Sequence, residues 1–489
     1  MSITIGKFTL ETLTTGMYDS PKDIYREYIQ NAVDSIDNAI QHGILKKELN
    51  CIEIKIDRKN ATVSITDNGT GIRVCNASDY LLNIGDSVKI NTENRGFRGI
   101  GRLAGLAYCD ELSFSTSYYG EDQRTIIKFD AKKLRNALYT SENHETLEKV
   151  FTDVVSISSE KEVKTKHYFT VTLCGVTDVD EILDKDEIFR YLSQVAPVPF
   201  SPKFKWKDII ISKLAYRGLH IGEYNIFLEG EENREQVFKD YADHYIADRI
   251  RKEEDVIEDI EERIFLDDNG KPMAILWYAK ARYSGTVQNE DIKGIRLRKG
   301  NIQLGTRTVL NSVFKDERFN GWLLGELHIL SPDLIPNARR DNVEKTHAYY
   351  ILTNRLRDWT DQISSMIRKI SLARNTARAN KRLSETIETI SSTNETIQVE
   401  KLPEIQLDEQ QEYNDVAHSE LLHQLDIILQ EKQALTKYKA LNIQTGITIE
   451  EKKVLETVLD IIQENFVEKA DCLVSAIIKG YKSKSSLKS

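Results

Sequence analysis

One helix-length segment near the start of the chain carries three polar residues that a helix would bring to one face. The segment reads Glu27-Tyr-Ile-Gln-Asn31-Ala-Val-Asp34. Residues four and three positions apart lie one above another on an α-helix, so Glu27, Asn31 and Asp34 share a face. The apolar residues between them supply the buried side. A carboxylate, an amide and a second carboxylate in one row are suited to activating water and holding a hydrated metal ion.

Two glycine-containing segments follow this predicted helix. Residues 61–67 have an alternating apolar pattern that predicts a half-buried strand, and Asp67-Asn-Gly-Thr-Gly71 begins at the end of this strand. Arg95-Gly-Phe-Arg-Gly-Ile-Gly-Arg102 opens a stretch that is predicted to be helical through residue 107. Glycine lets a backbone approach a ligand closely, and N–H groups at a helix N-terminus favour phosphate oxygens. The helix and the two glycine segments together predict a nucleotide site.

In this order the three motifs resemble those of the GHKL ATPases, the superfamily of gyrase B, the Hsp90 chaperones, histidine kinases and MutL, with MORC proteins related. The resemblance covers roughly residues 1–180. It implies an α+β fold, the Bergerat ATP-binding α/β sandwich, in which helices pack on one face of a mixed sheet. It also implies that the chain binds ATP and Mg²⁺ and hydrolyses ATP to ADP and phosphate.

The resemblance gives the motif residues their expected roles. Glu27 is the general base that deprotonates the attacking water. Asn31 presents its side-chain oxygen to Mg²⁺, and Asp34 lines the mouth of the nucleotide site. Asp67 accepts a hydrogen bond from the exocyclic amine of adenine. The other residues expected to bind ATP are Gly69, Gly71, Lys89, Gly96, Gly99 and Gly101.

One position departs from the family pattern. GHKL domains usually carry a Gly-Thr before the final strand, and its hydroxyl helps to hold the nucleotide. Residues 164–173 of this chain contain no Gly-Thr. Thr165 or Thr170 could substitute, and the spacing does not choose between them.

A later loop resembles part of the Hsp90 middle domain. Ser331-Pro-Asp-Leu-Ile-Pro-Asn-Ala-Arg-Arg-Asp341 is similar to the Hsp90 loop that supplies an arginine to the γ-phosphate of ATP. When the shared asparagine and acidic residue are aligned, Arg340 falls on that arginine. A guanidinium in this place would stabilise charge in the transition state. The alternative is that Arg339 and Arg340 pair with Asp341 or Glu344.

The rest of the chain is expected to form further domains. The expected divisions are 1–180 for the ATP-binding domain, 181–345 for an Hsp90-middle-like α/β domain, 346–390 for a helical extension, 391–415 for a flexible linker and 416–489 for a helical C-terminal region. Within the second domain, residues 209–214, 224–228, 273–278 and 294–298 are predicted strands. The acidic stretch 253–262 is predicted to be a solvated helix or loop.

Composition narrows the classes of protein that the chain can belong to. The net charge of −10 argues against coating of nucleic acid along the whole chain, and no apolar run is long enough to cross a membrane. Five scattered cysteines without C-x-x-C spacing make a zinc site or a disulfide framework unfavourable. The cytoplasm is therefore the expected compartment.

Two hypotheses for the cellular task remain open. The first is a chaperone-like, ATP-gated clamp, expected to be a homodimer, that grips a protein client. The second is a nucleic-acid-associated clamp of the MutL or MORC kind, working with a nuclease or in a defence system. The second is favoured by the basic residues Arg368, Lys369, Arg374, Arg378, Lys381 and Arg382. A histidine kinase is disfavoured, because no phosphoacceptor helix precedes the motifs.

Overall fold

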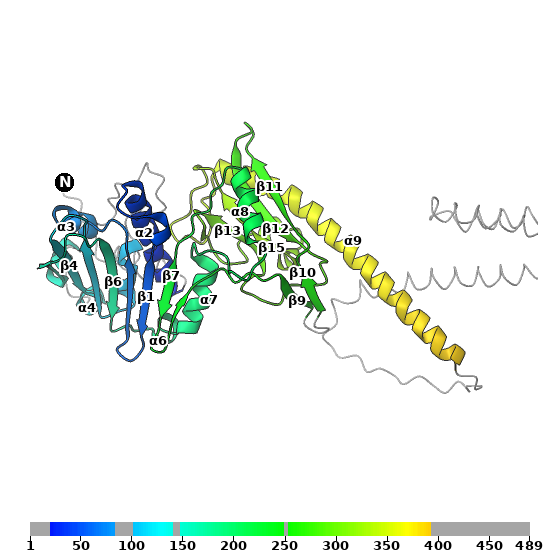
Figure 1. The fold of residues 1–489 in the computed structure, drawn as a ribbon, viewed down its shortest axis with the longest axis horizontal. Helices are drawn as coiled ribbons and strands as arrows, with labels where there is room; N and C mark the ends of the chain where they lie inside the picture. Colours follow the sequence, from blue (N-terminus) through cyan, green and yellow to red (C-terminus); the bar gives the residue numbers. More distant parts are fainter. Residues whose placement is uncertain (1–19, 84–100, 140–146, 249–252, 393–489) are drawn as a thin grey trace, which may run out of the picture. The chain divides into compact units, whose positions relative to one another are not determined.

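The computed structural model describes residues 20–83, 101–139, 147–248 and 253–392, all within one compact unit (Figure 1). The expected linker after residue 392 and the expected C-terminal helical region lie outside these residues. So do Lys89, Gly96 and Gly99 of the predicted nucleotide site. The expected domain boundaries stay predictions.

An eight-stranded sheet forms the first part of the fold. Its spatial order is β5 (Val155–Lys161), β4 (Gln123–Asp130), β3 (Glu111–Ser117), β6 (Tyr168–Cys174), β2 (Thr62–Asp67), β1 (Ile52–Asp57), β7 (Ile226–Glu229) and β8 (Arg234–Gln236). Neighbours are antiparallel except for β1 and β7, which are parallel. The strand predicted at residues 61–67 is confirmed, as is the one at 224–228 apart from its first two residues.

Helices cover one face of this sheet, as its alternating burial requires. In β1, Ile52, Ile54 and Ile56 are buried, whereas Glu53 and Lys55 between them face outward. The helices of this part are α2 (Asp23–Gln41), α3 (Val74–Leu82), α4 (Ala131–Tyr139), α5 (Leu147–Val154), α6 (Val179–Ile182) and α7 (Lys185–Val195), with short 3₁₀ turns η1 (Lys47–Leu49) and η2 (Gly101–Ala107). The result is a mixed α/β architecture with a large sheet.

The second part of the fold is built on a five-stranded sheet. Its order is β11 (Asp259–Leu266), β12 (Pro272–Lys280), β15 (Leu324–Ile329), β13 (Gly294–Lys299) and β14 (Ile302–Gln303). A separate ribbon pairs β9 (His244–Asp248) with β10 (Glu253–Val256), and the remaining helices are α8 (Lys207–Tyr216), η3 (Asn311–Val313), η4 (Glu317–Trp322) and α9 (His347–Ser392). The strands predicted at 273–278 and 294–298 are confirmed.

Two predictions for this part are wrong. Residues 209–214 form helix α8 rather than a strand, because Ile210 and Leu214, four positions apart, are buried while Ile209 is exposed. A short apolar run does not distinguish helix from strand by itself. The acidic stretch 253–262 forms β10 and the start of β11 rather than a solvated helix or loop. Asp255 in β10 and Ile260 in β11 are buried, although most of this stretch is charged.

Helix α9 leaves the second sheet as a single 46-residue helix, about 69 Å long at 1.5 Å per residue (Figure 1). Its first half packs through an apolar stripe that includes Leu352, Leu356, Trp359 and Ile363. Residues 347–392 are therefore helical.

A charged cluster lies inside the second part of the fold. Glu326 is fully buried and accepts hydrogen bonds from Lys239 Nζ at 2.9 Å and Arg298 Nε at 2.6 Å. Although burial alone would raise the pKa of Glu326, Arg298 and Lys239 hold that pKa well below its usual value. Trp277 Nε1 donates to the same carboxylate at 3.3 Å. The cluster is satisfied only while Glu326 is charged.

Replacing Glu326 by Gln should therefore destabilise the second part strongly. The change leaves two buried cations without a counter-charge, which typically costs about 3–5 kcal/mol. The shift can be measured as the midpoint of urea unfolding, followed by tryptophan fluorescence. The control is Glu160→Gln, which breaks an exposed ion pair with Arg124 and should cost less than about 1 kcal/mol. Equal shifts for both variants would contradict this account.

Candidate functional site

The polar face of α2 forms as the sequence predicts, and most of it is buried. Glu27 and Asp34 are 7% and 2% exposed, and Asn31 is half-buried on the same face. The opposite face, with Ile29 and Ile36 among others, packs into the core of the first sheet. The burial of two carboxylates on one face shows that this face is not an ordinary solvated helix surface.

The 3₁₀ turn η2 lies directly against Glu27. A Cβ atom on Gly101 would stand 2.1 Å from Glu27 Oε2, so a side chain at this position would have to displace the Glu27 carboxylate. The N–H of Gly105 donates to Tyr28 Oη at 2.9 Å, which fixes η2 on α2. Residues 101–107 of the predicted helix form a 3₁₀ turn instead, and this turn brings the last glycine of the lid motif to the predicted general base.

Asp67 ends β2 inside the protein. Its Oδ1 accepts the N–H of Gly69 at 2.8 Å, and the hydroxyl of Ser35 is hydrogen-bonded to the carboxylate. Burial raises the pKa of Asp67 to about 7, against the lowering effect of these two donors. A carboxylate held in this way is ready to accept one further hydrogen bond.

Both glycines after Asp67 are required by local geometry. A Cβ on Gly69 would lie 2.1 Å from Ser35 Oγ. Gly71 has φ +64°, and a Cβ there would lie 1.8 Å from the carbonyl oxygen of Ser117. The turn after β2 is thus pressed between α2 and the end of β3.

Thr170, one of the two threonines considered for the missing Gly-Thr contact, lies on the other face of the sheet from Asp67. In the register of β2 and β6, Asp67 is paired with Phe169, and Thr170 is paired with Thr66, whose hydroxyl lies 3.0 Å away. Side chains alternate between the faces of a sheet, so Thr170 points away from the Asp67 side. Thr165 precedes the strand. Ser35, which follows Asp34 on α2, supplies a hydroxyl to Asp67 instead, and the sequence reasoning missed it.

The loop that carries Arg340 has a defined, unusual backbone. Arg340 adopts φ +56°, a left-handed conformation that is uncommon for residues other than glycine. Its N–H donates to the carbonyl of Asn337 at 3.1 Å, and its carbonyl accepts the N–H of Gly305 at 2.8 Å. Backbone conformations of this kind persist where the surrounding contacts impose them and are frequent at functional sites.

This loop docks on the polar face of α2. Arg340 Nε lies 2.9 Å from Glu27 Oε1, with both side chains largely buried, and Arg340 Nη1 donates to the side-chain oxygen of Gln30. Arg26 Nη2 donates to the carbonyl of Arg339 at 3.1 Å. Two residues predicted from unrelated motifs, 313 positions apart along the chain, are therefore in direct contact. Sequence reasoning expected both near one phosphate and did not foresee the ion pair or Gln30.

The donor set on α2 is compatible with a magnesium ion. An amide oxygen such as that of Asn31, together with phosphate oxygens and water, is the type of coordination that Mg²⁺ takes at nucleotides. Among the described residues no group of three or more His, Cys, Asp or Glu side chains is arranged to hold a metal. Asp37, one turn beyond Asp34, accepts a hydrogen bond from the hydroxyl of Tyr224.

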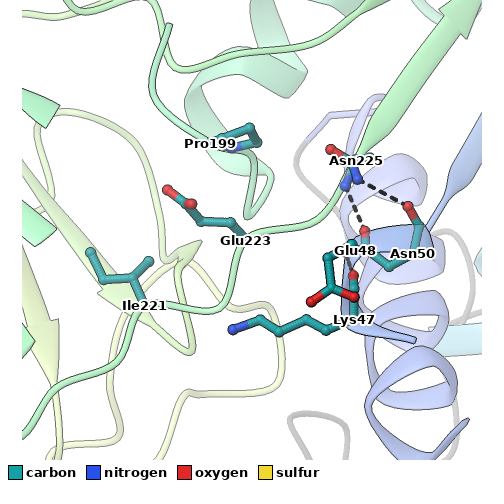
Figure 2. A pocket seen from close by; sticks show the side chains of 7 residues that line it. All are labelled: Lys47, Glu48, Asn50, Pro199, Ile221, Glu223 and Asn225. Atoms are coloured by element: carbon teal, nitrogen blue, oxygen red, sulfur yellow. Dashed lines mark hydrogen bonds between the residues drawn. The ribbon is translucent and has the colours of Figure 1, made fainter. Parts of the chain in front are cut away.

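A separate hollow of about 350 Å³ lies near η1 (Figure 2). It is lined by Lys47, Glu48, Asn50, Pro199, Ile221, Glu223 and Asn225. Asn225 donates from its backbone and its side chain to Asn50, as the dashed lines in Figure 2 show. None of the residues predicted to bind nucleotide lines this hollow.

The raised pKa of Asp67 makes a prediction for stability. A carboxyl whose pKa is about 7 in the folded protein and 3.8 when unfolded binds its proton more tightly in the folded state, so its contribution to stability falls as the pH rises from 4 to 7. Asp67→Asn removes this pH-dependent fall in stability, because asparagine does not titrate. The variant should gain melting temperature relative to wild type at pH 8, and the gain should shrink towards pH 5.

Asp57→Asn is the matched control for this comparison. Asp57 ends the neighbouring strand in the same way, but hydrogen bonds from Asn60 lower its pKa, so its replacement should not stabilise the protein at pH 8. A gain for Asp67→Asn that does not depend on pH would show that Asp67 is not the titrating group.

Comparison with known families gives one match. Residues 20–165 match the family model described as histidine kinase-, DNA gyrase B- and HSP90-like ATPase. The match contains α2, the Asp67 turn and η2, and ends before Arg340. No curated protein matches the chain significantly. Among the described residues, no helix has the length and apolar character to cross a bilayer. The segment 20–165 is thus a domain of the GHKL ATPase type.

Proposed function

We propose that the protein binds ATP with Mg²⁺ and hydrolyses it at a site formed by α2, the Asp67 turn and the loop that carries Arg340. The observation that carries this proposal is the contact of 2.9 Å between Glu27 and Arg340. A general base within the matched ATPase domain and an arginine outside it, each assigned to the γ-phosphate by its own motif, meet at one place. Members of the family that residues 20–165 match are ATPases, which supports ATP hydrolysis as the reaction.

The residues divide the chemistry between them. The Asp67 carboxylate accepts a hydrogen bond from the exocyclic amine of adenine. This contact selects ATP over GTP, because guanine has a carbonyl oxygen in the place of that amine. Asn31 would hold Mg²⁺, whose charge offsets that of the phosphates. Glu27 takes a proton from water as the water oxygen bonds to the γ-phosphorus and the bond to the bridging oxygen breaks, leaving ADP and phosphate. Arg340 stabilises the charge on the transferred group.

The ion pair also supports a clamp. Glu27 and the γ-phosphate would compete for the Arg340 guanidinium, because a cation held on Glu27 weakens this carboxylate as a base. Nucleotide state would thereby set the contact between the ATPase domain and the loop, which is what an ATP-gated clamp needs. As in the Hsp90-like reading of the sequence, we propose a homodimer that acts on a protein client.

A nucleic-acid clamp remains the second candidate, and α9 bears on it. Arg374 donates to the carbonyl of Tyr283 at 2.6 Å, Arg378 pairs with Glu253, and Arg368 lies over the ring of Phe319. Three of the basic residues that favoured this hypothesis therefore have partners within the protein. Internal contacts of this kind weaken, without removing, the argument for a phosphate-binding face.

Glu27→Ala should reduce steady-state ATP turnover by at least about a hundredfold, because a positioned general base contributes 10²–10⁴-fold to rate. ATP binding, measured by calorimetry, should survive. Glu48→Ala, an exposed glutamate on η1, is the control and should leave turnover unchanged. Wild-type turnover that is retained in Glu27→Ala would refute the assignment.

The same assay with duplex DNA separates the two clamp hypotheses. Turnover that depends on Glu27 and is indifferent to DNA supports a protein client. Turnover that rises several-fold with DNA, with the rise lost at high salt, supports the nucleic-acid clamp.

A further inference from the structure

Gln30 is a buried amide between the predicted general base and the docked arginine. It is 1% exposed and lies on α2 three positions after Glu27. Its side-chain oxygen accepts Arg340 Nη1, while Arg340 Nε contacts Glu27. Gln30 and Glu27 therefore hold two nitrogens of the same guanidinium.

The other end of this amide has no partner among the described residues. Gln30 Nε2 is buried and makes no hydrogen bond there. The orientation of the amide is fixed by chemistry, because a guanidinium can only donate and so must face the oxygen. A buried N–H₂ group without an acceptor destabilises a protein, and native structures keep such groups mainly where a ligand or water completes them.

We propose that Gln30 is a catalytic residue whose amide N–H donates to a γ-phosphate oxygen of ATP while its carbonyl oxygen holds Arg340. This inference rests on the proposed ATPase function and adds a donor that no motif assigned. Because Gln30 shares the Arg340 guanidinium with Glu27, we expect its N–H₂ group to lie near the phosphorus that water attacks. A neutral N–H aimed there stabilises negative charge as it develops on the transferred group.

The reaction balances with Gln30 in this role. Water forms a bond to the γ-phosphorus, the bond from that phosphorus to the β–γ bridging oxygen breaks, and the electron pair leaves with ADP. The proton of the water passes to Glu27 and then to solvent. Gln30 neither gains nor loses a proton, and its N–H shortens its contact to the phosphate oxygen in the transition state.

If Gln30 only positions Arg340, a different effect of its removal is expected. If the amide acts only through Arg340, its removal should matter no further once Arg340 is gone. If the N–H contacts the phosphate, its removal should still slow the reaction in an Arg340→Ala background. A double-mutant cycle separates the two.

The experiment measures single-turnover hydrolysis of radiolabelled ATP by the full chain. Wild type, Gln30→Met, Arg340→Ala and the double variant are compared, and ADP affinity is measured by calorimetry. Gln30→Met should lower the rate by about a hundredfold in wild type, as is typical for loss of one such donor, and by at least about tenfold in Arg340→Ala. ADP has no γ-phosphate, so its affinity should stay within about threefold of wild type.

Two further variants keep the test decisive. Gln41→Met, at the exposed end of α2, is the control for the substitution and should keep wild-type activity. Gln30→Glu retains an oxygen for Arg340 but has no N–H, so it should also lose turnover even if Gln30→Met folds poorly. Wild-type rate in Gln30→Glu, or no additional loss in the double variant, would overturn the proposal. Absence of hydrolysis in wild type would instead refute the ATPase function itself.

Discussion

The contact between Glu27 and Arg340 is the interaction on which the candidate site depends. It joins a helix of the ATPase domain to a loop that follows the second sheet, and both side chains are largely buried. Ion pairs that are removed from water need further hydrogen bonds to be tolerable. Gln30 supplies one of these, and Arg26 holds the carbonyl of Arg339 beside it. These contacts between the loop and α2 are polar, which suits the exchange with ATP that we propose.

Rigid elements hold this row in place from both sides. On one side, Tyr28 and Gly105 tie η2 to α2, and Gly101 allows the close approach to Glu27. On the other, the left-handed Arg340 is fixed by backbone bonds to Asn337 and Gly305. Catalytic groups need such support because small displacements cost large factors in rate.

The sequence predicted the parts of the site that depend on local periodicity. Glu27, Asn31 and Asp34 share a face because helical spacing dictates it, and Gly71 is a glycine because its φ is positive. It could not predict what depends on register and on tertiary contact. The pairing of Thr170 with Thr66 follows from strand register, and the engagement of Ser35 with Asp67 follows from how α2 is laid on the sheet. Likewise α8 was misread because its short apolar run fits either periodicity until one knows which side is buried.

The most direct test of the central claim is a crystal structure of the full chain with Mg²⁺ and a non-hydrolysable ATP analogue. The account predicts that the exocyclic amine of adenine lies against Asp67 and that the Arg340 guanidinium has moved from Glu27 to within hydrogen-bond distance of the γ-phosphate. A nucleotide bound on α2 with Arg340 still paired to Glu27, or turned away from the phosphates, would contradict the shared site.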